Sequence, residues 1–330
     1  LRASIDGMLW IIQGYMLGST IIQLIIGRLA DIYGRVRLFN TGFLIFTIAA
    51  LIAGLSSDWV LLATARIMQG IGGAFLMTLS ITILTDNVPR SVLGTWLGIN
   101  QVAWRIGAMV GLTISGVVID TFGWRWLFLI QVPVGVLAFV WSEMSLREKY
   151  KAPESRCIDL GGFILFTSFI TILLVYLTQV FRGVPRGEGL AMLLLSLLLL
   201  VSFAIWENKF KCSALDLTIF HNWQFTGGII SQLLYSMGFG AFLTLLVLLL
   251  EVVEGMSATL TGLGILPFEA SFLVFGVLGG RLSDKYGYAP LTSTGLIMSA
   301  VALYVISRIS MSGNGLLLLT ATIILGAGTG

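Results

Sequence analysis

Residues 27–34 read Gly27-Arg28-Leu29-Ala30-Asp31-Ile32-Tyr33-Gly34, and residues 280–287 read Gly280-Arg281-Leu282-Ser283-Asp284-Lys285-Tyr286-Gly287. The two octapeptides agree at six of eight positions, and each directly follows a long apolar run. An internal repeat of this kind indicates two homologous segments in one chain. Because the repeated segments are embedded in apolar sequence, the repeat predicts a membrane protein with two related halves.

The composition is that of a chain whose main solvent is lipid. Hydrophobic residues make up 57% of the 330 residues and charged residues only 11%, whereas soluble domains carry about 25% charged residues. Uninterrupted apolar stretches have about the twenty residues that a helix needs to cross the membrane. A barrel strand would alternate polar and apolar residues instead. The sequence therefore predicts an all-α membrane protein, and its 39 glycines suit close helix packing in lipid.

The distribution of charge predicts how the helices cross the membrane. Loops on one side carry twelve Lys and Arg residues, and loops on the other side carry five. Because cytoplasmic loops carry the excess of cations, both octapeptides are expected in the cytoplasm. Eleven spans are predicted, at about 8–27, 38–57, 60–84, 92–118, 126–142, 160–181, 189–206, 222–249, 257–279, 289–307 and 314–330.

The repeat also predicts the domain organisation. The octapeptides follow the first and the ninth span, so the two halves run in the same direction and are parallel, pseudo-symmetric repeats. We expect an N-terminal helical bundle at 1–142 without its first helix, linkers with two additional membrane helices at 143–221, and a truncated C-terminal bundle at 222–330. The chain is then a fragment of a fourteen-span protein.

Each octapeptide is predicted to form a cytoplasmic loop. The glycines at its ends allow close backbone approach, and its aspartate can accept hydrogen bonds from N–H groups at a helix start. A plain turn with cytoplasmic cations is the simpler alternative. The residues expected to act as conformational gates are Gly27, Arg28, Asp31, Gly34, Arg35, Arg37, Gly280, Arg281, Asp284 and Gly287.

The loop sequence Gly27-Arg28-Leu29-Ala30-Asp31-x-x-Gly34-Arg35-x-Arg37 resembles a signature of the major facilitator superfamily, and in particular of its fourteen-span drug:proton antiporter branch. Leu62–Gly73 is similar to the fourth-helix signature of that branch, and Phe122–Gly135 to its turn into helix six. The resemblance covers nearly the whole chain. It implies the major facilitator fold and a link between Arg66 and proton coupling.

One departure concerns the antiporter signature of helix five, of the form G-x-x-x-G-P-x-x-G-G. Residues 107–116 match it except that Leu112 replaces the proline and Ser115 replaces one closing glycine. This weakens the implication of exchange transport. The small residues still predict a flat helix face for close packing. They are Gly107, Gly111, Ser115 and Gly116.

Three charged residues are predicted well inside hydrocarbon: Arg66, Arg105 and Glu269. A charge at the bilayer centre costs about 2.5–3.5 kcal/mol, so such residues usually face the bundle interior or a watery cavity. Arg66 has the alternative of reaching outward to the membrane surface. Gln69 lies three residues after Arg66 and therefore on the same helix face. We expect Arg66, Gln69, Arg105 and Glu269 to lie on the proton or substrate pathway.

Glu269 is the candidate for proton coupling. Apolar surroundings disfavour the charged form of a carboxyl group, so Glu269 can serve to take up and release protons. Pro267 removes a backbone hydrogen bond and is expected to bend the helix at this level. Arg105 is suggested as the partner of Glu269. A neutral glutamic acid that merely joins two helices is the alternative.

Several kinds of function are excluded by what the sequence lacks. No G-x-x-x-x-G-K-[ST] phosphate loop is present. One His and two Cys residues, Cys157 and Cys212 in linkers, provide no metal ligand set. The protein is therefore expected not to be an enzyme, and to need no cofactor, metal, nucleotide or nucleic acid. A proton gradient is the expected energy source.

The sequence thus predicts a monomeric, multi-pass transporter of the plasma membrane that exports small lipophilic compounds or drugs. Proton antiport with alternating access is the expected mechanism. A dedicated exporter of one metabolite, lipid or siderophore is a second hypothesis. A non-transporting receptor or scaffold is the third, although a mere anchor has no need of charges inside the membrane.

Overall fold

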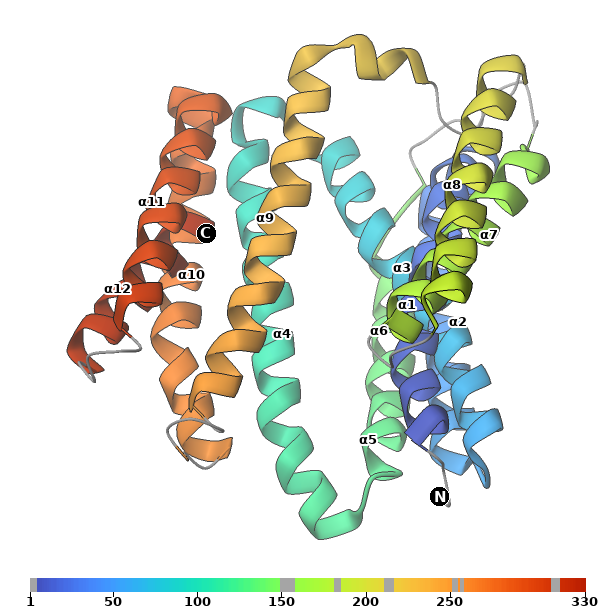
Figure 1. The fold of residues 1–330 in the computed structure, drawn as a ribbon, viewed down its shortest axis with the longest axis horizontal. Coiled ribbons are helices and arrows are strands. Elements are labelled where there is room, and N and C mark those ends of the chain that lie inside the picture. Colours follow the sequence, from blue (N-terminus) through green and yellow to red (C-terminus); the bar gives the residue numbers. More distant parts are fainter. Residues whose placement is uncertain are drawn as a thin grey trace. The chain divides into compact units, whose positions relative to one another are not determined.

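The computed structural model describes residues 5–148, 158–180, 185–210, 217–250, 255, 258–309 and 315–330. Helices make up almost all of these residues, and none of the residues described here forms a strand (Figure 1). The helices are α1 Ile5–Tyr33, α2 Arg35–Leu55, α3 Trp59–Asn87, α4 Leu93–Phe122, α5 Trp126–Leu129, α6 Gln131–Ser145, α7 Leu160–Val180, α8 Arg186–Lys209, α9 Trp223–Leu248, α10 Ala258–Tyr286, α11 Tyr288–Ile309 and α12 Gly315–Thr329. Short 3-10 helices lie at Arg90–Val92 and Leu217–His221.

The prediction of an all-α membrane protein is confirmed. Each of the eleven predicted spans coincides with a helix, α5 and α6 together forming the fifth. By length and composition, nine helical spans in the described part of the chain can cross a membrane. The apolar helix α12 is shorter than these nine.

The structure corrects the expectation that each octapeptide forms a loop. α1 continues to Tyr33 and α10 to Tyr286, so all but the last residue of each copy is helical. Gly34 and Gly287 form the turns, with φ of +102° and +84°, a backbone conformation that favours glycine. A hydropathy pattern marks only the part of a helix inside hydrocarbon, and these helices extend past it.

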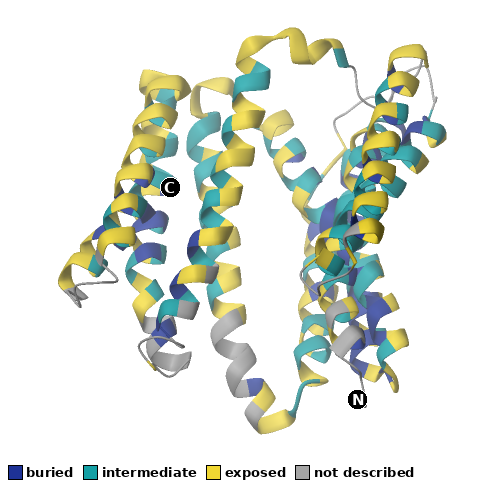
Figure 2. Ribbon diagram, in the orientation of Figure 1, coloured by how far each residue is buried: buried dark blue, intermediate teal, exposed yellow. Residues whose placement is uncertain are grey.

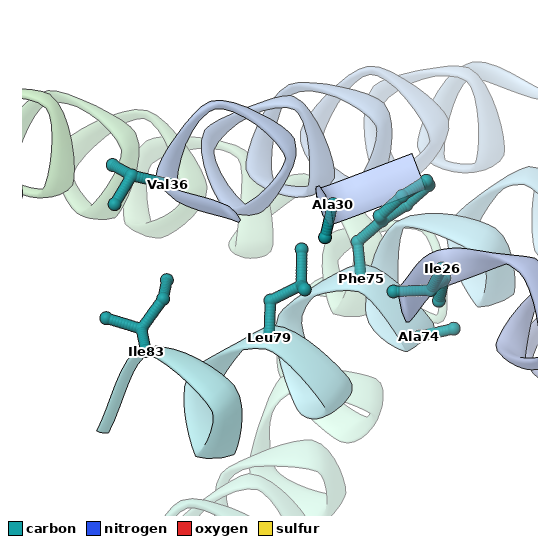
Figure 3. Close-up of a cluster of buried hydrophobic side chains, with 7 residues drawn as sticks. All are labelled: Ile26, Ala30, Val36, Ala74, Phe75, Leu79 and Ile83. Carbon is teal, nitrogen blue, oxygen red and sulfur yellow. The ribbon is translucent and has the colours of Figure 1, made fainter. Parts of the chain in front are cut away.

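Contacts divide the chain into two compact units, and the first joins Leu1–Asp86 to Ile114–Ile219. Its core lies where α1, α2 and α3 meet, and Figure 2 shows buried residues on these helices. Figure 3 shows the cluster, which buries Ile26 and Leu79 completely. Its other members are Ala30, Val36, Ala74, Phe75 and Ile83.

Further helix contacts complete the first unit. α5 and α6 pack against α2. α7 and α8 form a hairpin, and α7 packs on α1. Near the end of α7, Gln13 donates a hydrogen bond of 2.7 Å from Nε2 to Thr178 Oγ1. The α7–α8 hairpin therefore packs on α1 through α7.

The second unit joins Asn87–Thr113 to Phe220–Gly330. It contains the first part of α4 with α9, α10, α11 and α12, and its core centres on the fully buried Phe268. The remaining core residues are Phe242, Leu246, Leu250, Ala302 and Leu325. The division predicted from the sequence, with boundaries at 142 and 222, places all of α4 in the N-terminal bundle. That division stays a prediction.

Candidate functional site

The charged residues Arg105 and Glu269 form an ion pair inside the second unit. Arg105 Nη1, from α4, lies 2.9 Å from Glu269 Oε1 and 3.1 Å from Oε2 on α10. The two side chains are 12% and 14% exposed. Because both charges are largely removed from solvent, losing either partner leaves an uncompensated charge. The pair suggested from the sequence is thus present.

Aromatic rings surround the guanidinium of Arg105. Its Cζ lies 4.0 Å from the ring centroid of Phe272, 5.0 Å from that of Phe239 and 5.6 Å from that of Phe268. A cation placed over the face of an aromatic ring contributes about 0.5–2 kcal/mol of stabilising free energy. Pro267 lies inside α10 beside Phe268, and the helix continues through it. Arg105 is therefore held by one carboxylate and three phenyl rings.

Arg66 starts a hydrogen-bond chain in the first unit. Its Nη1 donates to Gln69 Oε1 at 2.7 Å, and Gln69 Nε2 donates to Gln131 Oε1 at 2.8 Å. Gln131 Nε2 then donates to the carbonyl of Leu127 at 2.7 Å. Gln69 is almost fully buried. The helical spacing of Arg66 and Gln69 correctly indicated that their side chains meet.

The surroundings of Arg66 are aromatic rather than acidic. Its Nε donates to the carbonyl of Ile11 at 3.3 Å. Its Cζ lies 4.6 Å from the ring centroid of Tyr15 and 5.9 Å from that of Phe128. Among the described residues, no carboxylate forms a salt bridge with Arg66. Sequence reasoning missed Gln131, because one uncharged residue in an apolar run gives little signal.

The first octapeptide forms a charge cluster with the end of α3. Arg35 Nη2 lies 3.0 Å from Asp31 Oδ1, and Arg35 Nη1 lies 2.5 Å from Asp86 Oδ2. Glu148 accepts a hydrogen bond of 2.9 Å from the N–H of Val36, at the start of α2. Arg28 is half-buried, whereas Arg37 and Gly27 are exposed. A Cβ at Gly27 would meet nothing within 4 Å, so the predicted close approach there is wrong.

The second octapeptide makes different contacts. Asp284 accepts hydrogen bonds from the N–H groups of Gly94 and Thr95, at 2.7 and 2.9 Å, and from Thr95 Oγ1 at 2.6 Å. Asp284 thereby caps the start of α4, the role that the sequence suggested for these aspartates. A Cβ at Gly280 would lie 2.5 Å from the carbonyl oxygen of Gly94. Arg281 is exposed.

The predicted packing face of α4 needs a correction. A Cβ at Gly107 or Gly111 would meet nothing within 4 Å. The side chain of Ser115 and the burial of Gly116 lie outside what the structure describes, as do Cys157 and Cys212. The close contacts of α4 involve Gly94 and Gly98 instead, and a Cβ at Gly98 would lie 2.5 Å from the carbonyl oxygen of Gly276. The predicted close packing is absent at Gly107 and Gly111 and is found earlier along α4, while the prediction for Ser115 and Gly116 stays untested.

Long apolar helices, two copies of one helix-to-turn element and a charge pair held between helices are the features of a multi-pass membrane protein. A family model described as Major Facilitator Superfamily matches residues 1–330. The chain belongs to the major facilitator superfamily. The predictions of a cell-membrane protein that is not an enzyme are confirmed, since this family is one of membrane transporters.

Relatives support the same class. The riboflavin transporter RibZ of Clostridioides difficile is 29% identical over 322 residues, covering 97% of this chain and 69% of RibZ. The multidrug transporter protein MdtP of Bacillus subtilis is 27% identical over 327 residues, covering 98% of this chain and 60% of MdtP. The chain thus spans about two thirds of these relatives.

Solved structures support the fold alone. The proton:xylose symporter XylE of E. coli, bound to 6-bromo-6-deoxy-D-glucose, aligns with a TM-score of 0.60 at 15% identity. The alignment covers 97% of this chain and 68% of XylE. At that identity the likeness concerns the arrangement of helices and not the substrate.

Proposed function

We propose that the protein exports small lipophilic compounds from the cytoplasm by proton antiport with alternating access. The observation that carries the proposal is the Arg105–Glu269 ion pair between α4 and α10. A largely buried carboxylate that a single proton can neutralise is a means of coupling proton uptake to helix movement. The relationship to MdtP, which is named as a multidrug transporter, supports the substrate class.

The ion pair and Asp284 join the same two helices at different levels. Asp284 lies fifteen residues after Glu269 on α10, which is about 22 Å along a helix. When Glu269 takes up a proton, Arg105 loses its counter-charge and the contact between Arg105 and Glu269 weakens. The contact between Asp284 and Thr95 then determines whether α4 and α10 stay together. Protonation thus favours one of two helix arrangements.

The first unit also contributes residues to the proposed pathway and to the proposed gate. Arg66 and Gln69 provide hydrogen-bond donors along the pathway, and their chain to Gln131 positions them. The cluster of Asp31, Arg35 and Asp86 joins α1, α2 and α3, and we assign it the gate role of the first octapeptide. Its opening requires that the two Arg35 ion pairs break.

The test is gradient-driven transport of a fluorescent cationic dye in proteoliposomes made with the full-length protein. Glu269→Gln keeps the side-chain shape but cannot exchange a proton, so gradient-driven efflux should disappear while dye binding remains. Glu188→Gln, a change at an exposed residue of α8, serves as the control and should transport normally. Unchanged transport in Glu269→Gln would remove this residue from the mechanism.

A dedicated exporter of one metabolite is the second candidate. It is favoured by the relationship to RibZ, which is named as a riboflavin transporter, and by Leu112 in place of the signature proline. The same proteoliposomes separate the two candidates. Efflux of several unrelated dyes supports multidrug export, whereas silence with all dyes and saturable transport of one metabolite supports the dedicated exporter.

A further inference from the structure

A cavity of about 430 Å³ lies on the α7–α8 hairpin, near the end of α8. Its lining residues are Leu165, Ser202, Ile205, Trp206, Lys209 and Phe210. Most of them are exposed, and Figure 2 shows exposed residues along the length of α8. The cavity therefore opens to the surroundings of the hairpin and not into its interior. None of its residues belongs to the ion pair or to the octapeptides described above.

Trp206 forms an aromatic wall of this cavity. Its indole Nε1 donates a hydrogen bond of 2.9 Å to Asp159 Oδ1. A Cβ added at Gly161 would collide with the indole ring, so the ring packs against α7 where only a glycine leaves room. The rings of Trp206 and Phe210 are stacked, with their centroids 5.5 Å apart. The aromatic wall is therefore in place before a ligand binds.

The charge that this end of the hairpin presents to its surroundings is positive. Asp159, which precedes α7, and Glu207, in the last turn of α8, are 2% and 4% exposed, so both side chains face the protein interior. Lys209 is exposed and lines the cavity. In the part of the chain that the structure describes, no carboxylate forms a salt bridge with Lys209. A ligand in the cavity thus meets one ammonium group and mostly apolar side chains.

The end of α8 lies on the same side of the first unit as the first octapeptide. α7 and α8 pair as a hairpin, so the start of α7 and the end of α8 are neighbours (Figure 1). Gln13, early in α1, bonds to Thr178, near the end of α7, so α1 and α7 run in opposite directions. Lys209 is therefore on the side where α1 ends. In the predicted topology that side is cytoplasmic, and the leaflet there carries anionic lipids.

An apolar stripe runs from the cavity along α8. Its members are exposed and lie three or four residues apart, so they share one helix face. They are Leu194, Leu198, Val201 and Ile205. From Leu194 to Ile205 the helix rises about 16 Å. This is about half of the 30 Å hydrocarbon core, which is the depth of one leaflet. The stripe therefore matches one acyl chain in length.

We propose that the cavity binds one anionic phospholipid of the cytoplasmic leaflet. The phosphate lies against the ammonium group of Lys209, the glycerol region packs on Trp206 and Phe210, and an acyl chain follows the stripe on α8. Lys209 distinguishes this lipid from a zwitterionic one, whose headgroup carries a cation of its own. The site is separate from the residues proposed for proton coupling.

The test is native mass spectrometry of the purified full-length protein, titrated with phosphatidylglycerol or with phosphatidylcholine of the same acyl chains. The wild-type protein should bind its first phosphatidylglycerol more tightly than its first phosphatidylcholine. Lys209→Gln should weaken that phosphatidylglycerol step about fivefold, the contribution of one cation near an anionic surface, and leave phosphatidylcholine unaffected. Lys209→Arg should bind like the wild type. Arg90→Gln, at an exposed cation before α4, is the matched control and should also bind normally.

Fluorescence quenching gives a second readout, which locates the lipid. Phosphatidylglycerol with brominated acyl chains, mixed into vesicles, should quench Trp206, whose signal is the difference between the wild type and Trp206→Phe. The same fraction of brominated phosphatidylcholine should quench it less. Ser202→Phe fills the cavity without changing the charge, and it should reduce the binding of phosphatidylglycerol in both experiments.

Equal affinity for the two lipids, or phosphatidylglycerol binding that Lys209→Gln leaves unchanged, would overturn the proposal. Equal quenching of Trp206 by the two brominated lipids would do the same. A cavity filled by a linker of this chain would give these contradicting results. Glu269→Gln should bind phosphatidylglycerol like the wild type while it loses gradient-driven transport, so this proposal and the proposed function can fail separately.

Discussion

At the scale of single residues, alanine substitutions at Gly34 and Gly27 are predicted to have opposite effects on stability. Gly27 is the first and Gly34 the last residue of the first octapeptide. Gly34 has φ of +102°, and a Cβ there would lie 2.6 Å from Glu148 Oε2. Such a backbone costs a side chain about 1–3 kcal/mol. Gly34→Ala should therefore lower the thermal unfolding midpoint.

Gly27→Ala is the matched control. Gly27 is helical and its Cβ position is open, and alanine is favoured over glycine inside a helix by about 0.5–1 kcal/mol. Its midpoint should stay the same or rise. Equal losses in the two variants would mean that the turn is not where the structure places it.

The ion pair predicts strong coupling between Arg105 and Glu269. Breaking a buried pair typically costs about 3–5 kcal/mol, whereas replacing both partners with neutral residues is often nearly neutral. Arg105→Met alone should therefore destabilise the protein more than Arg105→Met combined with Glu269→Gln. A double-mutant cycle on unfolding midpoints measures this. Simple additivity of the two single changes would show that the residues do not interact.

The residue scale also shows what sequence reasoning can reach. Arg105 and Glu269 were identifiable because charges are rare in apolar sequence, and Arg66 and Gln69 because three positions separate them. Asp159 and Glu207 lie where apolar runs end, so the sequence treats them as parts of polar linkers. Their burial together depends on how α7 and α8 pair, which no local pattern contains.

At the scale of helices, α4 offers a comparison between glycines on the same helix. A Cβ added at Gly98 would lie 2.5 Å from the carbonyl oxygen of Gly276, whereas a Cβ added at Gly107 would meet nothing within 4 Å. Forcing a methyl group into a packed contact costs about 1–3 kcal/mol. Gly98→Ala should lower the unfolding midpoint, and Gly107→Ala should not. The reverse order would place the packing face where the antiporter signature suggested.

Helix positions were predictable from hydropathy, and helix ends were not. All eleven predicted spans contain a helix, yet α1 and α10 run six to seven residues past the predicted ends at 27 and 279. Hydropathy reports which residues lie in hydrocarbon, whereas a helix ends where its backbone hydrogen bonding ends. Here that point is a glycine with positive φ, which composition alone does not identify.

At the scale of the whole molecule, the two octapeptides have the same local structure and different partners. Both end at a positive-φ glycine whose N–H donates to the carbonyl four residues earlier at 2.9 Å. Asp31 pairs with an arginine, whereas Asp284 caps a helix. A repeat in the sequence therefore predicted a repeat in structure, but the partners depend on which helices surround each copy.

The central claim is that both octapeptides lie on the cytoplasmic side as parallel repeats. It is tested most directly by labelling with a membrane-impermeant maleimide after Cys157 and Cys212 are replaced by serine. Arg37→Cys, Lys285→Cys and, as the outside control, Ser57→Cys each introduce one exposed site. The account predicts that the first two react in inside-out vesicles and not in intact cells, with Ser57→Cys the reverse. Labelling of Arg37→Cys and Lys285→Cys from opposite sides would contradict it.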